Sequence, residues 1–347
     1  MKILIYDYLF VKGHIHPNTH YIKLLAKEHE VSVISVSSIY EELSEEVHII
    51  KIQSKYTSSD IKKNRFAQVS FCKDVLRQVN VKSFDAVLFL SYDTDSFTFA
   101  YPMFPSKTLF VLQSHNNIDK LSQNWIHRIL FNGYKNKVRH IVYEEFMKDK
   151  LVETYKVNPE TIFVLPRARF SYEICPTEKS FSAIGLSGSN SDEYIQQLAS
   201  EADNKSESFK NIRVLLKAHR PIDSKTGIIS VINNRVSDQE YKELFNSTRV
   251  VLDPLPNTFM YRMSAVLFEA LSSRKIVIGS DTKIIAHFSK KYPHICLAAK
   301  SPADMLNLIQ GISLSETEQE KKEFDRFMID YSDEKTMMVF NAAFSKS

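Results

Sequence analysis

The chain has 347 residues, of which 44% are hydrophobic and 25% charged, a composition typical of a folded globular protein. This length exceeds that of one ordinary domain and favours two domains of roughly 150–200 residues each. The formal net charge is only +4, which lacks the strong basic excess of a nucleic-acid-binding protein, so we expect no nucleic-acid partner.

Three widely spaced cysteines, Cys72, Cys175 and Cys296, form neither a CxxC pair nor a disulfide framework, and we expect reduced thiols in a cytoplasmic protein. The first strand-like run is interrupted by Asp7 and lacks a small-residue cleavage site, which makes it a poor signal peptide. No stretch approaches the roughly 20 apolar residues of a membrane span, so any membrane contact is expected at the surface, on the inner face.

In the first half of the chain, short β-rich runs alternate with amphipathic segments, a pattern typical of parallel sheets with crossover helices. The predicted strands are residues 2–8, 30–36, 84–90, 108–113, 139–143 and 161–165, and the predicted helices are residues 20–28, 60–78, 124–134 and 145–155. The second helix is predicted to place Ile61, Phe66, Val69, Cys72 and Leu76 on one side.

The same alternation restarts after a junction near residues 166–176. Strands are predicted over 181–186, 213–217, 227–233, 249–253 and 275–279, and helices over 192–199, 237–246, 264–272, 301–309, 315–328 and 333–344. Ser237 and Glu240 are spaced as a capping box, and Ser301 before Pro302 marks another helix start. We therefore expect an N-terminal domain over 1–168, a C-terminal domain over 169–325, and a helix over 326–347 that crosses back to the N-terminal domain.

The most informative segment runs from Asp253 to Asp281 and is predicted to be strand, loop, helix and strand. Its loop brings Arg262 to the start of a helix, where free backbone N–H groups and the positive end of the helix dipole attract a diphosphate. Glu269 follows about two turns later, where a carboxylate can accept hydrogen bonds from ribose hydroxyls. Ligands of open α/β sheets bind beyond the carboxyl ends of the strands, so two such domains predict one substrate on each.

This segment resembles the donor-site signature of the retaining GT-B glycosyltransferases of family 4. Glu269-Ala270 matches the family's E-A pair, and residues 277–281, Val-Ile-Gly-Ser-Asp, resemble its last strand. Residues 237–254 are similar to the S-D-E-E-L and V-x-P stretch that precedes it. The resemblance implies a GT-B fold, in which two Rossmann-like doubly wound parallel-sheet domains face each other across a cleft, and retaining transfer from a nucleotide-sugar donor.

Several positions depart from the family pattern. Tyr261 stands where the family's first glutamate is expected, and Arg262 and Ser264 replace its two loop glycines. The basic pair that usually follows the first C-terminal strand is missing at residues 186–191. Arg262, Lys217 and Arg220 are candidates to supply that charge, whereas the lost glutamate leaves the sugar and the stereochemistry open.

The resemblance also implies roles for individual residues. His115, Arg262 and Glu269 are the expected catalytic residues. The expected donor contacts are Gly13, Lys217, Arg220, Asn234, Arg235, Val236, Tyr261, Met263, Ser264 and Ala265. The expected acceptor contacts are His14, His16 and Asp93.

Two motifs raise the possibility of a metal site. His14, His16 and His20 have a spacing that fits zinc, but no fourth ligand is evident. Asp93-Thr94-Asp95 is similar to the D-x-D of GT-A enzymes, but the tandem α/β layout favours loop acids after a strand. We therefore predict no metal and no cofactor, because the donor, a UDP-sugar in our interpretation, is a substrate.

Residues 125–140 interleave basic and apolar side chains, which predicts either a half-buried helix or a surface for anionic lipid headgroups. The predicted function is a glycosyltransferase acting on a glycan or lipid-linked acceptor in cell-surface polysaccharide biosynthesis. One alternative is an epimerase or hydrolase on the same fold, which would turn over a donor without an acceptor. Another is a non-catalytic degenerate transferase that binds a partner subunit, an interpretation that the lost glutamate favours.

Overall fold

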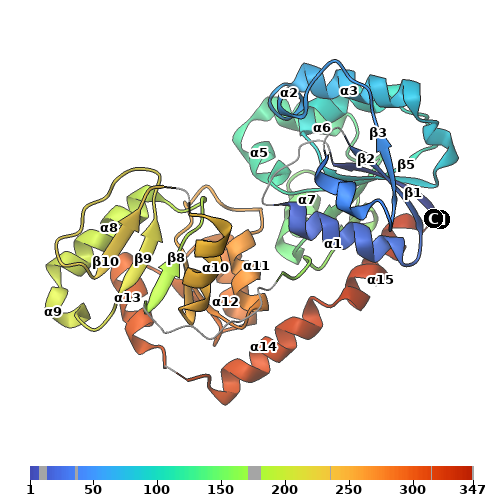
Figure 1. The fold of residues 1–347 in the computed structure, drawn as a ribbon. Helices are drawn as coiled ribbons and strands as arrows, with labels where there is room; N and C mark the ends of the chain where they lie inside the picture. The colour runs from blue at the N-terminus through green and yellow to red at the C-terminus, as the bar shows by residue number, and fades with distance from the viewer. Residues whose placement is uncertain (8–13, 36–37, 171–180, 235, 314, 346–347) are drawn as a thin grey trace. The chain divides into compact units, whose positions relative to one another are not determined.

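The computed structural model describes residues 1–7, 14–35, 38–170, 181–234, 236–313 and 315–345 (Figure 1). The chain divides into two compact units, which we call unit 1 (Met1–Ala168 with Tyr331–Ser347) and unit 2 (Arg169–Asp330). Three residues named above, Gly13, Cys175 and Arg235, lie outside the described residues. Within the described parts of the chain, no helix has the length and apolar character needed to cross a membrane.

Unit 1 is built on a parallel sheet of seven strands in the order β3-β2-β1-β4-β5-β6-β7. The strands are β1 (Lys2–Asp7), β2 (Glu30–Ser35), β3 (His48–Lys51), β4 (Ala86–Ser91), β5 (Leu109–Gln113), β6 (Arg139–Val142) and β7 (Ile162–Val164). The order reverses between β1 and β4, so the carboxyl ends of these two strands form the switch point at which such sheets bind ligands.

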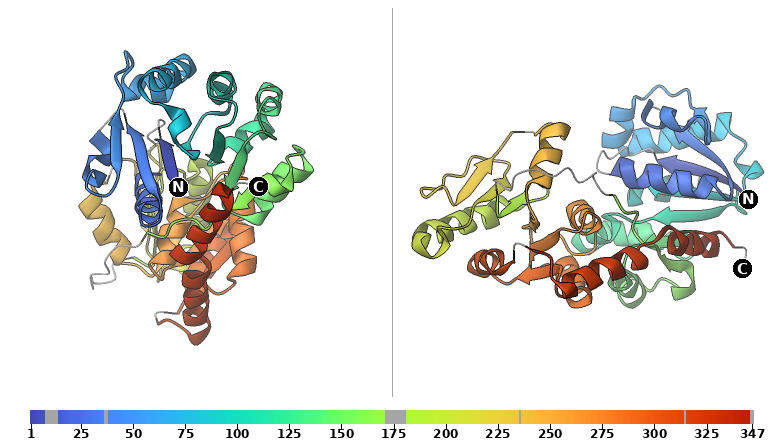
Figure 2. Two further views of the ribbon diagram at one scale, coloured as in Figure 1. Left: turned by 90° about the vertical axis from the view of Figure 1, so that its right-hand side faces the viewer. Right: turned by 60° about the horizontal axis from the view of Figure 1, so that its bottom comes forward.

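Helices cover both faces of this sheet (Figure 1, Figure 2). They are α1 (Ile15–Ala26), α2 (Ser58–Lys63), α3 (Arg65–Gln78), α4 (Thr94–Ala100), α5 (Asn117–Gln123), α6 (Trp125–Asn132), α7 (Glu145–Glu153) and α15 (Asp333–Phe344). Successive strand side chains point to opposite faces. Ile3 and Ile5 therefore join the buried cluster that includes α1 and α15, whereas Tyr6 stacks on Phe89 with their ring centroids 4.5 Å apart.

The single helix predicted over residues 60–78 is wrong. The chain forms two helices, α2 and α3, because Asn64 adopts an extended conformation and its side-chain oxygen accepts a hydrogen bond from Phe66 N at 2.9 Å, starting a new helix. The break changes the phase of the buried face. Phe66 is consequently 85% exposed, and Phe71 and Val75 are buried instead.

The end of the chain returns to unit 1 through α15. The Tyr331 hydroxyl donates to Glu144 Oε1 at 2.6 Å, and His20 Nε2 lies 2.8 Å from Asp333 Oδ1. The preceding helix, α14 (Glu318–Asp330), belongs to unit 2, where it packs on α11. The chain therefore passes from one unit to the other between these two helices.

Unit 2 contains a parallel sheet of six strands in the order β10-β9-β8-β11-β12-β13, again with a reversal, here between β8 and β11. The strands are β8 (Ala183–Gly185), β9 (Val214–Lys217), β10 (Ile229–Ile232), β11 (Val250–Asp253), β12 (Ile276–Ser280) and β13 (Cys296–Ala299). Its other helices are α8 (Asp192–Asn204), α9 (Ser206–Phe209), α10 (Asp238–Asn246), α11 (Ala265–Ser272), α12 (Lys283–Lys291) and α13 (Pro302–Gly311).

The predicted helix starts of unit 2 are confirmed by their capping bonds. The Ser237 hydroxyl oxygen accepts from Glu240 N at 3.2 Å, and Ser301 accepts from Asp304 N at 3.1 Å. Ser264 caps α11 in the same way, accepting from Leu267 N at 3.3 Å. These bonds satisfy backbone donors that the first turn of a helix otherwise leaves without an acceptor.

Gly185, the last residue of β8, permits close packing at the switch point of unit 2. A Cβ added there would lie 2.7 Å from Leu216 Cδ2 and 2.9 Å from the Leu252 carbonyl oxygen. We predict that Gly185→Ala lowers the free energy of unfolding by roughly 1–3 kcal/mol, because the backbone oxygen cannot move away cheaply. Urea denaturation followed by far-UV circular dichroism measures this change.

Gly188→Ala is the matched control, because a Cβ at Gly188 meets nothing within 4 Å. Equal stability of the two variants would contradict the close packing described for Gly185.

Candidate functional site

A buried carboxylate, Asp7, ends β1 at the switch point of unit 1. Its side chain is 2% exposed and accepts hydrogen bonds from Asn18 Nδ2 at 2.8 Å, from the Tyr40 hydroxyl and from the Ser91 hydroxyl. Asn18 lies in α1, Tyr40 in the 3-10 turn after β2, and Ser91 at the end of β4. Through these hydrogen bonds Asp7 fastens the three segments to the carboxyl edge of the sheet.

His115, a predicted catalytic residue, follows β5 at the same edge. Its Nε2 lies 2.7 Å from the Leu90 carbonyl oxygen, which can only accept, so Nε2 carries the proton. Its Nδ1 lies 3.3 Å from the Tyr143 hydroxyl, and that hydroxyl accepts from Gln113 Nε2 at 2.8 Å. Both ring nitrogens are thus engaged, and the network does not place His115 as a general base.

His14, a predicted acceptor contact, stacks on His115 with the ring centroids 3.9 Å apart. Burial, the neighbouring His115 ring and Arg167 lower the pKa of His14 to about 2. Burial and Arg167 likewise lower the pKa of His115 to about 3. The two stacked imidazoles are therefore neutral at physiological pH, and they lie at the carboxyl edge of unit 1.

Arg167 and Tyr143 are members of this site that sequence reasoning missed. Arg167 is 4% exposed, and its guanidinium lies 5.5 Å from the centroid of the Tyr143 ring. Its charge also lowers the pKa values of both stacked histidines. The sequence offered one indication for Arg167: it follows the strand predicted over residues 161–165, and so stands at the carboxyl edge of the sheet.

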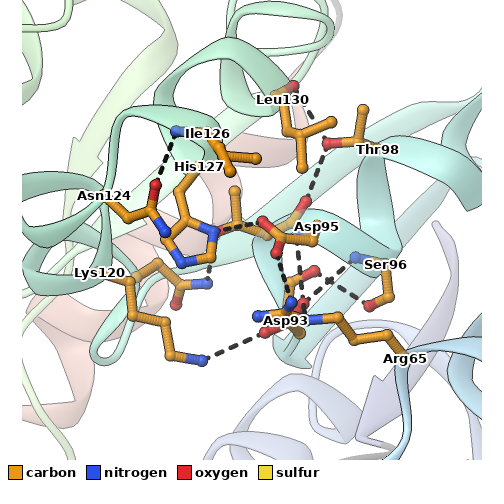
Figure 3. A network of polar contacts seen from close by, with 12 residues as sticks. Arg65, Asp93, Asp95, Ser96, Thr98, Lys120, Asn124, Ile126, His127 and Leu130 are labelled. Carbon is orange, nitrogen blue, oxygen red and sulfur yellow. Dashed lines mark hydrogen bonds and ion pairs between the residues drawn. The ribbon is translucent and has the colours of Figure 1, made fainter.

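Asp93, also a predicted acceptor contact, is occupied by contacts within the protein (Figure 3). Its carboxylate accepts from Ser96 N at 3.2 Å and from Lys120 Nζ at 3.2 Å, and it lies 3.3 Å from Arg65 Nε. Although burial opposes the change, Lys120, the Ser96 N–H and Arg65 hold the pKa of Asp93 below its ordinary value.

Asp95 completes this network by pairing with Arg65 Nη1 at 2.9 Å and with His127 Nδ1 at 2.6 Å. The prediction of loop acids is wrong, because Asp93 caps α4 and Asp95 lies in the first turn of that helix. The network joins α3, α4, α5 and α6, so its role in the described structure is to hold these helices together.

The H-x-H-x(3)-H spacing does not bring its three histidines into one group. His14 stacks on His115, His16 is exposed in the first turn of α1, and His20 pairs with Asp333. Across the described ranges, no group of three or more histidine, cysteine or acidic side chains is placed to hold a metal ion.

In unit 2, the loops after β8 and β11 are joined at the switch point. Asn190 Nδ2 donates to the carbonyl oxygens of Gly185 and Lys217, at 2.8 and 3.0 Å, and Ser191 N donates to the Pro254 carbonyl at 2.8 Å. These bonds fix the loop at residues 186–191, where the resemblance expected a basic pair. Asn190 here has a structural role that the sequence did not indicate.

The predicted donor segment lies between β11 and α11, at the carboxyl edge of this sheet. Arg262 places its guanidinium 4.1 Å from the centroid of the Phe259 ring, just before Ser264 caps α11. Met263 is buried and Ala265, the first residue of α11, is exposed. The arrangement presents a cation beside the N-terminus of a helix, which is a favourable site for an anion.

Tyr261, where the sequence resemblance expected a glutamate, is buried and held by Lys283. The Lys283 ammonium donates to the Tyr261 hydroxyl and lies 4.5 Å from the centroid of its ring. Lys283 begins α12, directly after the end of β12, and sequence reasoning missed it. It supplies a second cation at the carboxyl edge, in the place where the family pattern has a carboxylate.

Glu269 lies on α11 and is half-buried. Its Oε2 accepts a hydrogen bond from the Tyr241 hydroxyl of α10 at 2.8 Å. Tyr241 in turn stacks on Phe245, with the ring centroids 5.9 Å apart. This contact orients one carboxylate oxygen of Glu269, a positioning role for Tyr241 that the sequence did not reveal.

The other predicted donor contacts of unit 2 lie at the end of β9 and in the loops that follow β9 and β10. Lys217 ends β9 with a half-buried side chain, and Arg220 is exposed with its Nε 3.9 Å from Asp192 Oδ2. Asn234 is exposed in the loop after β10, and Val236 is half-buried in that loop. All follow the carboxyl ends of strands, as the ligand site of a parallel sheet requires.

In sequence the chain matches no protein-family model and no curated protein. In structure it is similar over nearly its whole length to several solved proteins. A glycosyltransferase from Rickettsia africae has a TM-score of 0.63 and 15% identity over 100% of this chain and 99% of that one. HepE from Anabaena, solved with UDP and glucose, has a TM-score of 0.65 and 10% identity over 98% of both chains. WaaG, a glycosyltransferase involved in lipopolysaccharide biosynthesis, has a TM-score of 0.62 and 13% identity over 99% of this chain and 98% of that one.

The chain has the GT-B fold. Its two parallel-sheet units each carry polar side chains at the carboxyl edge.

A cavity of about 690 Å³ lies at the other edge of the unit 2 sheet, lined by residues that include Ser182, Arg213 and Arg249. Arg249 there pairs with Glu320 at 2.5 Å, and sheets of this type bind ligands at the carboxyl edge, so we do not place the site in this cavity.

The neutral state of His115 predicts a pH dependence of stability. Its pKa is about 3 in the folded protein and about 6.5 when unfolded, so below pH 6.5 the unfolded chain binds a proton that the folded chain does not. This contribution therefore lowers stability as the pH falls below 6.5, by roughly 2 kcal/mol at pH 5. We predict that His115→Gln loses less stability than the wild type between pH 7.5 and pH 5, as measured by urea denaturation.

His48→Gln is the control, because His48 is exposed on β3. If the wild type and His115→Gln lose equal stability over this pH interval, His115 is not held neutral by the fold.

Proposed function

We propose that the chain is a glycosyltransferase that transfers a sugar from a nucleotide-sugar donor bound by unit 2 to a glycan or lipid-linked acceptor bound by unit 1. The observation that carries this proposal is the segment from β11 to α11, which combines a helix N-terminus, Arg262 beside it and Glu269 on the same helix. The similar protein HepE was solved with UDP and glucose, which supports UDP as the nucleotide.

The donor diphosphate is assigned to the N-terminus of α11. There the backbone N–H groups of Ser264 and Ala265 and the guanidinium of Arg262 are the proposed contacts. Lys217 and Arg220, after β9, add positive charge at the same edge. Such preorganised donors stabilise the charge that develops on a leaving diphosphate, so in this proposal no metal ion is required.

The ribose is assigned to Glu269. A carboxylate has two oxygens with several acceptor sites, and Tyr241 orients one of these oxygens through the 2.8 Å hydrogen bond. Asn234 and Val236, in the loop after β10, are the proposed contacts of the base. Tyr261 and Lys283 take the place of the family's first glutamate, so we assign them to the sugar of the donor.

The acceptor is assigned to the carboxyl edge of unit 1. The neutral stack of His14 and His115 offers a flat aromatic surface, on which a sugar ring can pack, and His16 is exposed nearby in the first turn of α1. Asp93 is a poor acceptor contact, because Lys120, Arg65 and the N-terminus of α4 already occupy its carboxylate. Retention of configuration, which the sequence resemblance implies, is part of the proposal and is checked by NMR of the product linkage.

Nucleotide-sugar binding is the first test. UDP-, GDP- and ADP-sugars are titrated into the protein by calorimetry, with and without Mn²⁺. We expect one nucleotide to bind independently of Mn²⁺, and we expect Glu269→Ala and Arg262→Ala each to weaken it by about 10- to 100-fold, because each removes a charge-assisted contact. Glu318→Ala, which removes an exposed glutamate of α14, is the charge-matched control.

The outcomes distinguish the alternatives. Binding by none of these nucleotide sugars contradicts the proposal and favours a non-catalytic module. Donor consumption in the absence of any acceptor favours an epimerase or hydrolase on the same fold.

We further propose that unit 1 docks on the inner face of an anionic membrane, where a lipid-linked acceptor would be found. Large apolar side chains are exposed on the neighbouring helices α3, α4 and α6: Phe66, Phe99, Trp125, Ile126 and Ile129. Trp125 is 66% exposed, and the basic side chains Lys62, Lys63 and Arg128 are exposed on α2 and α6. Apolar insertion combined with basic side chains is the pattern of proteins that bind the surface of anionic membranes.

The structure refines the sequence interpretation of residues 125–140. Phe131 and His140 are buried, and His127 pairs with Asp95, so only part of that stretch is available to lipid. Phe66 and Phe99, which lie outside the stretch, extend the exposed apolar surface.

A vesicle assay tests this docking. We predict that the Trp125→Ser, Ile129→Ser double variant loses at least about fivefold of its binding to phosphatidylglycerol vesicles, because it removes buried apolar area from the bound state. Met338→Ser is the control, since Met338 is equally exposed but lies on α15. Unchanged binding of the double variant in sedimentation assays would refute membrane docking by α6.

A further inference from the structure

The two sheets of the chain each place an aspartate at the end of a switch-point strand, and the two aspartates differ in their hydrogen bonding. Asp7 ends β1 and accepts hydrogen bonds from Asn18, Tyr40 and Ser91. Asp253 ends β11 and is 0% exposed, and no described donor meets its carboxylate oxygens in good hydrogen-bond geometry, although the Ser264 hydroxyl lies near enough to favour the charged form. A buried carboxylate without such partners is costly, so this difference calls for an explanation.

Within the described residues, no ion pair joins Asp253 to a cation. Its strand lies between β8 and β12, and its register partner on β12 is Gly279. On β13 the titratable group that faces it is the Cys296 thiol, whose pKa is raised by burial and by the charge of Asp253. On the loop before α11, the nearby group is the uncharged hydroxyl of Ser264.

The burial of Asp253 brings its charged and neutral forms into balance near pH 6. Burial raises the pKa of Asp253 to about 6, and the Ser264 hydroxyl acts in the opposite direction. Ser264 is also the residue that caps α11, since its oxygen accepts from Leu267 N. The carboxyl group thus adjoins the helix N-terminus at which we place the donor diphosphate.

We propose that binding of the donor diphosphate at the N-terminus of α11 is coupled to the uptake of one proton by Asp253. This inference rests on the proposed function, and it makes Asp253 a positioning residue for the donor. The proton comes from solvent and binds a carboxylate oxygen of Asp253, and no bond of the donor changes. A like charge close to a buried carboxylate disfavours its charged form, so the arriving diphosphate favours the neutral acid.

The coupling fixes the direction of the pH dependence. Near pH 6 about half of the free protein already carries the proton, whereas near pH 8 the proton must be taken up when the donor binds. Donor affinity is consequently highest below about pH 6 and falls as the pH rises. The expected loss between pH 6 and pH 8 is about tenfold or more.

Calorimetry with UDP-glucose tests this directly, because its diphosphate is esterified at both ends and keeps its charge over this pH range. Titrations near pH 7 in two buffers of different ionisation enthalpy give the number of protons taken up per donor bound. We expect between about half a proton and one proton for the wild type, and none for Asp253→Asn, with an affinity that no longer depends on pH. Cys296→Ala, which changes the neighbouring titratable group, should keep the wild-type uptake.

Each other outcome overturns the inference. UDP-glucose binding without proton uptake, or with equal uptake in Asp253→Asn, rejects the coupling but leaves the proposed donor site intact. If UDP-glucose, GDP-sugars and ADP-sugars all give no binding heat, both the coupling and the proposed donor site are rejected. This outcome differs from failure of the coupling alone, in which UDP-glucose still binds.

A second variant serves if Asp253→Asn does not fold. Ser264→Ala removes the hydroxyl that favours the ionised carboxylate, so the pH midpoint of donor affinity should move upward. An unchanged midpoint in a folded Ser264→Ala protein would overturn the role of Asp253.

Discussion

Parallel pairing of strands is the constraint on which the rest of this structure depends. Every strand pair described in the two sheets is parallel, so all carboxyl ends of a sheet lie at one edge. The strands are buried between helices and carry mainly apolar side chains, which leaves the loops at the two edges to carry the polar groups. The proposed donor and acceptor residues follow from this arrangement, because they stand at the ends of strands, in the loops after them or, like Glu269 and His16, on the helix that comes next.

The same constraint explains why the sequence predicts the fold well. Buried runs such as residues 86–91 and 250–253 are apolar without alternation, and helical segments separate them, so the α/β class could be predicted and is confirmed. The GT-B fold, which the resemblance of residues 253–281 implied, is confirmed as well. Short or exposed elements were missed. β3 has only four residues at the edge of its sheet, and α4 begins directly after its N-cap Asp93, whose acidic motif was interpreted as a loop.

The helix predicted over residues 60–78 shows where periodicity fails. A pattern of apolar residues continues through Asn64, but the side chain of this residue caps a new helix and changes which face is buried. Candidate site residues were predictable where local sequence defines them, as at Ser264 and Arg262 beside a helix start. Tyr143, Arg167 and Lys283 were not, because distant parts of the chain bring them to the edge of the sheet.

The two carboxyl edges have different electrostatic character. In unit 1 the switch-point carboxylate accepts three hydrogen bonds, and two neutral histidines are stacked near the buried Arg167. In unit 2 the cations Arg262, Lys217 and Lys283 stand at an edge whose switch-point carboxylate is neutralised easily. This contrast favours an uncharged sugar acceptor for unit 1 and an anionic donor for unit 2.

Hydrogen–deuterium exchange of the full chain, with and without a saturating nucleotide sugar, tests the central claim most directly. The claim is that the loop before α11 and the first turn of that helix hold the donor diphosphate through backbone N–H groups. Slower exchange on binding is predicted for peptides covering residues 254–272 and 186–191, because bound phosphate oxygens protect these amides. Protection confined to unit 1, or no protection of these peptides by a nucleotide sugar that binds, would contradict the assignment.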